Sequence, residues 1–230
     1  MVAAVLIDAR RRVLIAQRPA GKHLAGAWEF PGGKLEPGEA PRAGLARELR
    51  EELGIAVGPP RPLLRLRHRY PSREVLLDIF VVRRFHGRPR GLDGQALRWC
   101  DRAALEAADL LPADRPIVAA LKLPERLRRS RAAGYRVMRA RDFDNGRALK
   151  SMRERGPTRG LAPLLGAACR DGAEAEAAAA AGADFIALAA ALEPGALAAL
   201  CSRVSVPLFA RGLSLERAWV LGASGVNALV

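Results

Sequence analysis

Residues 32–55 read GGKLEPGEAPRAGLARELREELGI, and this stretch decides how the first half of the chain is interpreted. It combines two glycines with an early glutamate, Glu39, and it ends in the acidic run RELREELG. Two interpretations of that run compete. One is an ordinary surface helix whose charges pair with one another, and the other is a loop and helix that together hold divalent cations.

The second part of the stretch predicts a helix over Ala40–Leu53. Pro41 stands near its start and Gly54 just past its end, which is the usual asymmetry of helix boundaries. Leucine recurs at every fourth position from Leu45 to Leu53, so one face of the helix is expected to be buried.

The same helix carries three glutamates, Glu48, Glu51 and Glu52, at positions i, i+3 and i+4. At about 100° per residue their carboxylates project from one face and repel one another. A hard divalent cation such as Mg²⁺ relieves that repulsion, because it takes carboxylate oxygens together with phosphate oxygens of a substrate. The glycines Gly32 and Gly33 suit a loop whose backbone comes close to such an ion or to the phosphates.

The spacing of the whole stretch favours the cation-binding interpretation. Glu39 lies eight residues before Arg47, and we expect this pair, with Gly33, to brace the loop against the helix. From Gly33 the sequence runs through five residues to Glu39 and through seven more to Arg47, and it continues as RELREELGI to Ile55. This pattern resembles, without departure, the Nudix hydrolase signature G-x5-E-x7-R-E-U-x-E-E-x-G-U, in which U is apolar.

The resemblance extends over about Met1–Leu127 and is strongest to the MutT branch, because WEFPGGKLEPGE is similar to the MutT lead-in. MutT-type enzymes hydrolyse oxidised guanine nucleoside triphosphates to the monophosphate and pyrophosphate. The resemblance therefore implies a Nudix α/β/α sandwich with Mg²⁺-dependent pyrophosphohydrolase activity, with Mn²⁺ as an alternative cofactor. The implied substrate is 8-oxo-dGTP, and the implied role is nucleotide-pool sanitation.

The resemblance also implies which residues hold the metal. The expected ligands are the Gly32 carbonyl and the side chains of Glu48, Glu51, Glu52 and Asp93. Glu48 matches the general base as well, and Glu51 is grouped with it as catalytic. Asp93 stands in the loop GLDGQ where MutT proteins carry a glutamate. Because aspartate is shorter, a water would then bridge it to the metal.

A further set of residues is implied to bind the substrate. Lys34 and Arg18 match phosphate clamps, although Arg18 also fits an exposed charge at a strand end. The residues expected around the nucleoside are His23, Phe30, Tyr70, Arg73 and Asp114. Asp114, in the loop LPADRP, replaces the family's base-reading asparagine. An ionised aspartate only accepts hydrogen bonds, so it receives N7–H of 8-oxoguanine but donates to O6 only when protonated.

Composition limits the other classes of protein. The net charge of +14 favours anionic ligands, but 34 of the 38 basic residues are arginine, which is typical of a GC-rich genome. With aromatics at 5% and no nucleic-acid motif, we expect no dedicated nucleic-acid site. The chain shows neither a long apolar run nor a leader signal, and its three cysteines are widely spaced. A cytoplasmic protein without a membrane partner is therefore expected.

Hydrophobic patterns predict further elements in residues 1–127. A hairpin is expected from Val2–Ile7 and Val13–Ala16, joined by the polar turn Asp8–Arg12. The other predicted strands are Leu63–Tyr70, Val75–Phe85 and Ala96–Cys100, and the other predicted helices are Ala103–Ala108 and Ile117–Leu123.

The remainder of the chain divides into residues 128–160 and 161–230. The first part is rich in arginine and is expected to be a linker or a poorly packed strand and helix. The second alternates strands with short helices, which is typical of parallel β-α units. It resembles a shortened thiamine-phosphate synthase (ThiE/TenI-like) domain, which implies a partial, degenerate β/α barrel.

That domain is expected to lack synthase activity, because the family's Gly-Gly phosphate turn is replaced here by Ala210-Arg211-Gly212. Stability, small-ligand sensing and dimerisation remain open as its role, and the open sheet edges of a half barrel favour a homodimer through this segment.

Two alternative functions remain open. One is a Nudix diphosphatase that acts on a thiamine-pathway diphosphate or another nucleoside diphosphate derivative. The other is a Nudix-fold module that senses a nucleotide without cleaving it, and the complete set of glutamates in the signature argues against it.

Overall fold

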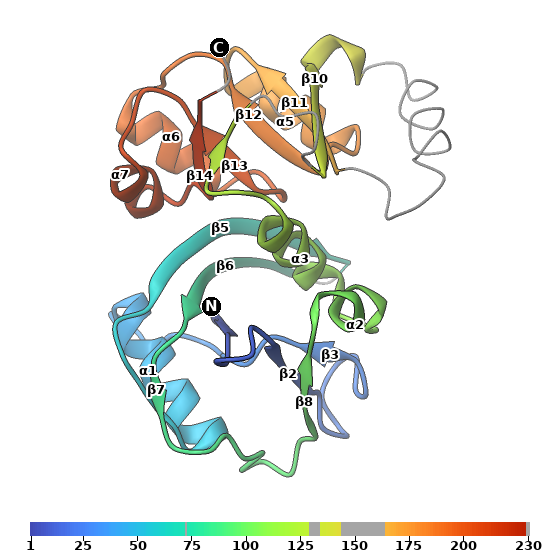
Figure 1. The fold of residues 1–230 in the computed structure, drawn as a ribbon, viewed down its shortest axis with the longest axis vertical. Coiled ribbons are helices and arrows are strands. Elements are labelled where there is room, and N and C mark those ends of the chain that lie inside the picture. Colours follow the sequence, from blue (N-terminus) through green and yellow to red (C-terminus); the bar gives the residue numbers. More distant parts are fainter. Residues whose placement is uncertain (72, 129–133, 144–163, 229–230) are drawn as a thin grey trace. The chain divides into compact units, whose positions relative to one another are not determined.

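A computed structural model describes residues 1–71, 73–128, 134–143 and 164–228. The chain forms two compact units (Figure 1). Unit 1 comprises Met1–Leu63 and Tyr70–Val118, and unit 2 comprises Leu64–Arg69 and Ala119–Val230. In the described residues no helix is both long enough and apolar enough to cross a bilayer.

Three small sheets build the first half of the chain. The strand order of the first sheet is β1-β6-β5, with β1 at Val2–Leu6, β5 at Arg61–Tyr70 and β6 at Arg73–Val82. The order of the second is β3-β2-β8, with β2 at Val13–Gln17, β3 at Trp28–Glu29 and β8 at Leu97–Cys100. In the third, β4 at Ala56–Val57 pairs with β7 at Phe85–His86.

The helices of this half are α1 at Pro41–Leu53, α2 at Arg102–Ala107 and α3 at Arg115–Lys122, and a 3-10 turn, η1, covers Pro112–Asp114. The predicted amphipathic helix is confirmed in α1, where Leu45, Leu49 and Leu53 are fully buried. They pack in one cluster with β1 residues such as Leu6. At about 25 cal/mol per Å² of buried apolar surface, such leucine burial is the main force holding a helix to a sheet.

Two details of the first half differ from expectation. The expected hairpin of the first two strands is confirmed only at its turn, where Ile7 and Val13 form one antiparallel bridge, because β1 itself pairs in parallel with β6. The Asp8 carboxylate accepts from Arg12 N at 2.8 Å and so holds the turn that sends β2 into its own sheet. The single strand Val75–Phe85 is wrong. The exposed pair Arg83-Arg84 interrupts it, and Phe85 pairs with the short β4 that the sequence did not reveal.

The later part of the chain is one parallel sheet with the order β10-β11-β12-β13-β14-β9. Its strands are β9 at Arg126–Leu127, β10 at Tyr135–Arg139, β11 at Leu164–Cys169, β12 at Phe185–Leu188, β13 at Leu208–Ala210 and β14 at Gly225–Asn227. Its helical segments are the 3-10 turn η2 at Ala140–Asp142 and the helices α5 at Gly172–Ala180, α6 at Pro194–Cys201 and α7 at Leu215–Val220. The predicted alternation is confirmed.

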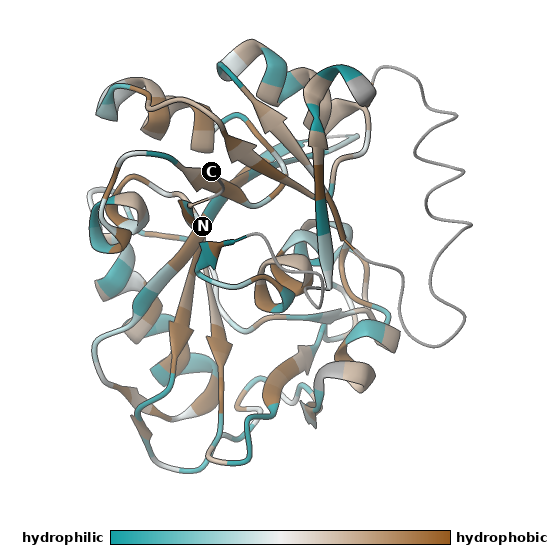
Figure 2. Cartoon of the chain, turned by 45° about the horizontal axis from the view of Figure 1, so that its top comes forward, coloured by the Kyte–Doolittle hydropathy of each residue, from teal (hydrophilic) through white to brown (hydrophobic). Residues whose placement is uncertain are grey.

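This sheet is a partial β/α barrel with a core on each face. Phe185, Phe209 and Leu127 pack together in one cluster, while alanines and leucines such as Ala178 and Leu200 form the other with the helices. In Figure 2 the brown, hydrophobic colour accordingly concentrates along strands. The mixed α/β class and the partial barrel are thus confirmed.

The Arg-rich segment 128–160 is described only in part. Strand β10 lies in it and pairs in parallel with β11, whereas residues 129–133 and 144–160 lie outside the described residues. The last residues of the expected first domain, in β9, pair with β14. The domain limits 1–127, 128–160 and 161–230 themselves stay predictions.

Candidate active site

Helix α1 presents the acidic run to the pocket because its ends and its buried face are both defined. Ala40 is the N-cap, Pro41 opens the first turn, and Gly54 ends the helix in the left-handed conformation with φ 66°. With the leucine face buried, the carboxylates of Glu48 and Glu52 lie on the side of the helix that lines a cavity.

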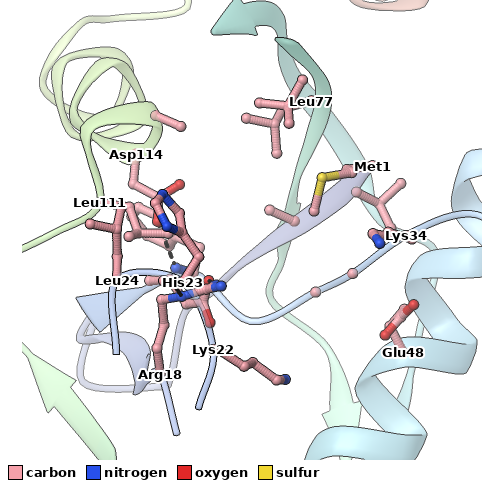
Figure 3. Close-up of a pocket in the computed structure, with 18 of the residues that line it drawn as sticks. Met1, Arg18, Lys22, His23, Leu24, Lys34, Glu48, Leu77, Leu111 and Asp114 are labelled. Atoms are coloured by element: carbon pink, nitrogen blue, oxygen red, sulfur yellow. Dashed lines mark hydrogen bonds and ion pairs between the residues drawn. The ribbon is translucent and has the colours of Figure 1, made fainter. Parts of the chain in front are cut away.

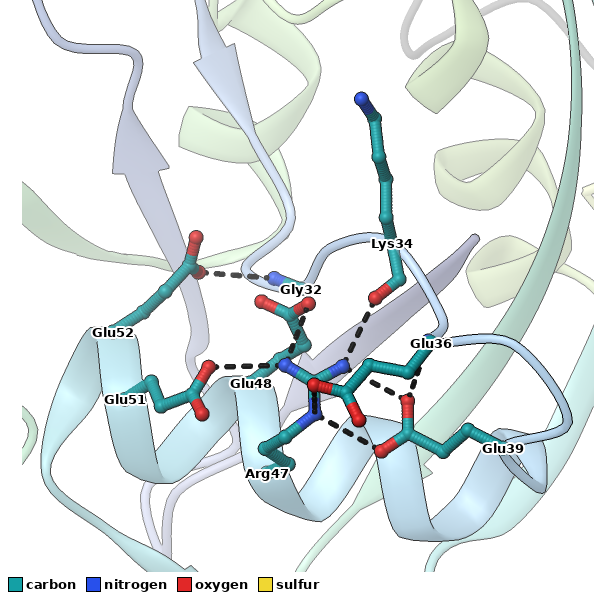
Figure 4. A network of polar contacts seen from close by, with 8 residues as sticks. All are labelled: Gly32, Lys34, Glu36, Glu39, Arg47, Glu48, Glu51 and Glu52. Atoms are coloured by element: carbon teal, nitrogen blue, oxygen red, sulfur yellow. Dashed lines mark hydrogen bonds and ion pairs between the residues drawn. The ribbon is translucent and has the colours of Figure 1, made fainter.

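Arg47 joins the preceding loop to this helix (Figure 4). Its guanidinium donates two hydrogen bonds of 2.9 Å to the Glu39 carboxylate and one of 3.0 Å to the Lys34 carbonyl. Its Nη1 donates to Glu48 at 3.1 Å and to Glu51 at 3.0 Å. The bond from Arg47 is the main cause that lowers the pKa of Glu39 to about 2, so this pair stays ionised at neutral pH.

The backbone of Gly32 and Gly33 lies directly against the glutamates. Gly32 has φ 147°, and a Cβ there would come within 2.3 Å of the Val2 carbonyl oxygen. A Cβ on Gly33 would lie 2.3 Å from the Glu48 carboxylate. The Gly32 N–H donates to Glu52 at 3.3 Å. Gly32 therefore requires glycine for both space and conformation, whereas a Cβ on Gly33 would displace the Glu48 carboxylate.

Glu52 lies in an environment that disfavours its charge. Burial raises its pKa to about 7, and the nearby charges of Glu48 and Glu29 act in the same direction. The bond from Gly32 N–H opposes the shift without cancelling it. The site thus gathers more negative charge than its own donors compensate.

These donors fit a hard divalent cation. Two carboxylates, Glu48 and Glu52, line the pocket beside the Gly32–Gly33 backbone, and Mg²⁺ takes few protein oxygens and completes its shell with water and phosphate. Within the described ranges no group of three acidic, His or Cys side chains that could hold a metal ion is found.

Two of the expected metal ligands lie outside this cluster. Glu51 is 58% exposed and points at Arg47. Asp93 is exposed and absent from the pocket lining, although its loop is anchored on α1 through Leu92 N–H and Gln95 Nε2, which both donate to the Glu52 carbonyl. Their roles as ligands stay predictions.

The pocket itself has a volume of about 470 Å³ and connects the glutamates to a second group of residues (Figure 3). In Figure 3, Asp114 and His23 lie at one end, and Lys34 and Glu48 lie at the other. The substrate residues expected from the sequence all line it: Arg18, His23, Phe30, Lys34, Tyr70, Arg73 and Asp114. His23 meets Tyr70 edge to face at 6.0 Å between ring centres, and the Arg73 guanidinium lies 5.7 Å from the Tyr70 ring.

Asp114 is a buried acid at one end of the pocket. Its carboxylate accepts from the Phe30 N–H at 3.1 Å, and its own N–H caps the turn at the Leu111 carbonyl. Burial raises its pKa to about 8, and the charge of Glu29 adds to the shift. The side chain is therefore mostly protonated at neutral pH, which no sequence pattern indicated.

Sequence reasoning missed two further charged residues in the lining, Glu29 and Lys22. Glu29 forms an ion pair with Arg18, whose Nε donates to the His23 carbonyl at 2.8 Å. Arg18 is thus engaged on the pocket wall, and its role as a phosphate clamp stays a prediction. Glu29 lies within WEFPGG, directly before Phe30, which the sequence analysis had assigned to the substrate site. Its position in that run could therefore have indicated that it lines the pocket.

Comparison with known proteins identifies the family of this chain. Residues 2–120 match the NUDIX domain, so the chain belongs to the Nudix family, and it is a Nudix hydrolase. The match ends at residue 120, and the C-terminal part lies outside it.

Two relatives from Escherichia coli (strain K12) share this half. An 8-oxo-dGTP diphosphatase is 36% identical over 118 residues, which are 51% of this chain and 92% of the relative. A CTP pyrophosphohydrolase is 40% identical over 119 residues, which are 52% of this chain and 88% of the relative.

Solved structures cover the same half. The solution structure of the E. coli ORF135 protein is 40% identical, with a TM-score of 0.47, and the match covers 52% of this chain and 85% of that one. A structure from a study of MutT from Aliivibrio salmonicida and Vibrio cholerae is 34% identical, with a TM-score of 0.45, and covers 51% and 90%.

Proposed function

We propose that the chain is a Mg²⁺-dependent nucleoside triphosphate pyrophosphohydrolase that converts 8-oxo-dGTP to 8-oxo-dGMP and pyrophosphate. One observation carries the proposal. A single pocket of about 470 Å³ joins the acidic cluster at Glu48 and Glu52 to the buried acid Asp114. Carboxylates at one end suit a metal-bound triphosphate, and a buried donor and acceptor at the other suits the edge of a base.

In this proposal Gly32, Glu48 and Glu52 hold the cation, with Glu51 and Asp93 as further candidates. The cation, when bound, neutralises charge on the phosphates. Glu48 orients a water and takes its proton as the water attacks phosphorus in line. The phosphoanhydride bond between the α and β phosphates breaks, and pyrophosphate leaves. Arg47 holds the Glu48 carboxylate in place at 3.1 Å, and Lys34 faces the phosphates.

Asp114 reads the base in the same proposal. A protonated carboxyl is both a donor and an acceptor, so it matches O6 and N7–H of 8-oxoguanine as an amide would. Its raised pKa of about 8 and its buried position support this role. Guanine presents an acceptor at N7 instead, and one of the two hydrogen bonds is then lost. Phe30 and Tyr70 would cover the faces of the base.

A pyrimidine triphosphate is the second candidate substrate, because the CTP pyrophosphohydrolase relative is 40% identical over the same half of the chain. The two substrates differ at the Asp114 end of the pocket, since cytosine offers an amino donor in place of O6 and has no N7–H. Relative rates on the two triphosphates therefore decide between them.

The test is a screen for pyrophosphate release with Mg²⁺ over 8-oxo-dGTP, dGTP, CTP, ADP-ribose and thiamine diphosphate. We expect the highest kcat/KM for 8-oxo-dGTP and a turnover that is lower by orders of magnitude in Glu48→Gln. Preferred cleavage of CTP supports the second candidate, and preferred cleavage of thiamine diphosphate supports a thiamine-pathway role. Tight binding of nucleotide by a folded protein without turnover contradicts hydrolysis and supports a sensor.

For the C-terminal unit we propose a degenerate ThiE/TenI-like barrel without synthase activity. The parallel order from β10 to β9 supports the barrel, and Arg211 in the turn after β13 supports the loss of the phosphate site. Strands β10 and β9 are the open edges in the described part of this sheet, which favours a homodimer. Sedimentation that shows only monomer over a wide concentration range contradicts the dimer.

A further inference from the structure

The segment Glu29–Gly32 runs along the pocket between its two acidic ends. The Phe30 N–H donates to Asp114 at 3.1 Å, and two residues later the Gly32 N–H donates to Glu52 at 3.3 Å. An extended chain covers about 7 Å in two residues. One short run of backbone thus spans the distance from the base-reading acid to the metal-binding acid.

Glu29 is the charged side chain that this segment contributes to the pocket, where it lies next to Phe30 in the chain and beside those two contacts. Burial is the main cause that raises the pKa values of Asp114 and Glu52, and the negative charge of Glu29 is a further cause for both. Glu29, Glu52 and Asp114 all line the same pocket. A nucleotide has its sugar between base and phosphates, so Glu29 occupies the level of the sugar.

The carboxylate of Glu29 is held but not saturated. Arg18 Nη1 binds Oε2, and Arg18 is itself fixed by its bond to the His23 carbonyl. In the part of the chain that the structure describes, Glu29 makes no other side-chain hydrogen bond, which leaves Oε1 to accept one more. The Glu29 side chain is 24% exposed, so a ligand in the pocket can reach it.

The other parts of a nucleotide fit Glu29 less well than the sugar does. A phosphate is anionic and is repelled by a carboxylate, and the proposed function places the base at the Asp114 end of the pocket. A sugar hydroxyl is a neutral donor, and a carboxylate is an acceptor for it. One free oxygen can bind one hydroxyl well.

We propose that Glu29, held by Arg18, accepts a hydrogen bond from a single hydroxyl of the nucleotide sugar and so determines how strongly the enzyme depends on that hydroxyl. This inference rests on the proposed function, because it assumes a nucleoside triphosphate in the pocket. Glu29 contacts substrate in this arrangement and takes no part in the bond cleavage.

The test combines variants with substrates that lack one hydroxyl. We would measure kcat/KM for GTP, 2′-deoxy-GTP, 3′-deoxy-GTP and 2′,3′-dideoxy-GTP in wild type, Glu29→Gln and Glu29→Ala. For wild type, removing the bound hydroxyl lowers kcat/KM about tenfold to a hundredfold, since the hydrogen bond involves a charged acceptor. In Glu29→Ala the penalty disappears, and in Glu29→Gln, which keeps a neutral acceptor, it is reduced.

A purely structural role for Glu29 gives a different result. Loss of the ion pair with Arg18 alone would lower kcat/KM for all four substrates by the same factor and leave their ratios unchanged, which overturns the inference. Dissociation constants of the matching monophosphates, measured by calorimetry without metal, repeat the comparison without turnover. Glu216→Ala, an exposed carboxylate in α7 outside the pocket, is the matched control and keeps wild-type ratios.

The outcomes separate this inference from the proposed function. If wild type cleaves neither these triphosphates nor 8-oxo-dGTP, the proposed function is wrong. If it cleaves them and the ratios do not change in Glu29→Ala, the function stands and the sugar contact is wrong. Thermal unfolding of both variants shows whether they are folded, and the isosteric Glu29→Gln keeps the test decisive if Glu29→Ala is not.

Discussion

The carboxylate of Glu48 lies so close to the backbone of Gly33 that a Cβ at that position would sit 2.3 Å from it. Real Cβ atoms do not approach that closely, so the glycine of the signature reserves space for the glutamate. The loop and the helix thus form one unit, in which the position of the loop determines the position of Glu48.

Gly33→Ala is expected to displace the Glu48 carboxylate and lower kcat about tenfold to a hundredfold, since displacements of about 1 Å have such effects in catalytic sites. Thermal unfolding and kcat on 8-oxo-dGTP provide the measurement. Gly195→Ala in α6 is the control, because a Cβ there meets nothing within 4 Å. Wild-type kcat in a folded Gly33→Ala protein would show that Glu48 does not need this position.

Glu48→Gln and Glu51→Gln are expected to differ in effect. Glu48 lines the pocket and its loss should lower turnover by orders of magnitude with little change in folding. Glu51 is 58% exposed and bound to Arg47, so its loss should have a smaller effect. Single-turnover rates with Mg²⁺ measure both. Equal losses would return Glu51 to the metal site as a direct ligand.

Glu39→Gln is expected to weaken the brace at neutral pH but not in strong acid. The Arg47 bond lowers the pKa of Glu39 from its ordinary 4.5 to about 2. Its stabilising contribution is therefore present above about pH 4.5 and is lost as pH falls towards 2. Urea unfolding against pH measures this difference between wild type and variant. Glu36→Gln, whose side chain is 69% exposed and 3.9 Å from Arg47, is the control with a smaller effect.

Asp114→Ala is expected to lose the preference for 8-oxo-dGTP over dGTP, because it removes both the donor and the acceptor at the base edge. The measurement is the ratio of kcat/KM for the two substrates. In wild type this ratio should also fall as pH rises through about 8, where Asp114 loses its proton. An unchanged ratio in the variant removes Asp114 from base recognition.

Asp114→Asn is expected to gain stability relative to wild type as pH rises. Between about pH 4 and 8 the folded protein keeps a proton that the unfolded chain releases, so the free energy of unfolding of wild type falls by about 1.4 kcal/mol per pH unit. Asparagine does not titrate, and the difference should level off above about pH 8. A difference that is constant from about pH 5 to 9 would mean that Asp114 is ionised throughout.

Local pattern was sufficient for the elements that carry the site. Pro41, Gly54 and the leucine repeat predict α1 to within one residue, because helix ends and one buried face are properties of neighbouring residues. The spacing of the signature likewise predicted the pairing of Glu39 with Arg47, which the structure contains. The prediction that Glu48, Glu51 and Glu52 project from one face of the helix was only partly right. Glu51 and Glu52 are separated by about 100° on the helix, and Glu51 points to Arg47.

The sequence by itself thus determined the proposed metal-binding end of this protein, since loop, helix and glutamates all lie within residues 32–55. The tertiary structure decided the rest of the pocket. Only packing brings Asp114 onto the Phe30 N–H, buries it and raises its pKa, and only packing places Glu29 between the two acidic ends. Burial and charge proximity are sums over residues far apart in the chain, and no local spacing contains them.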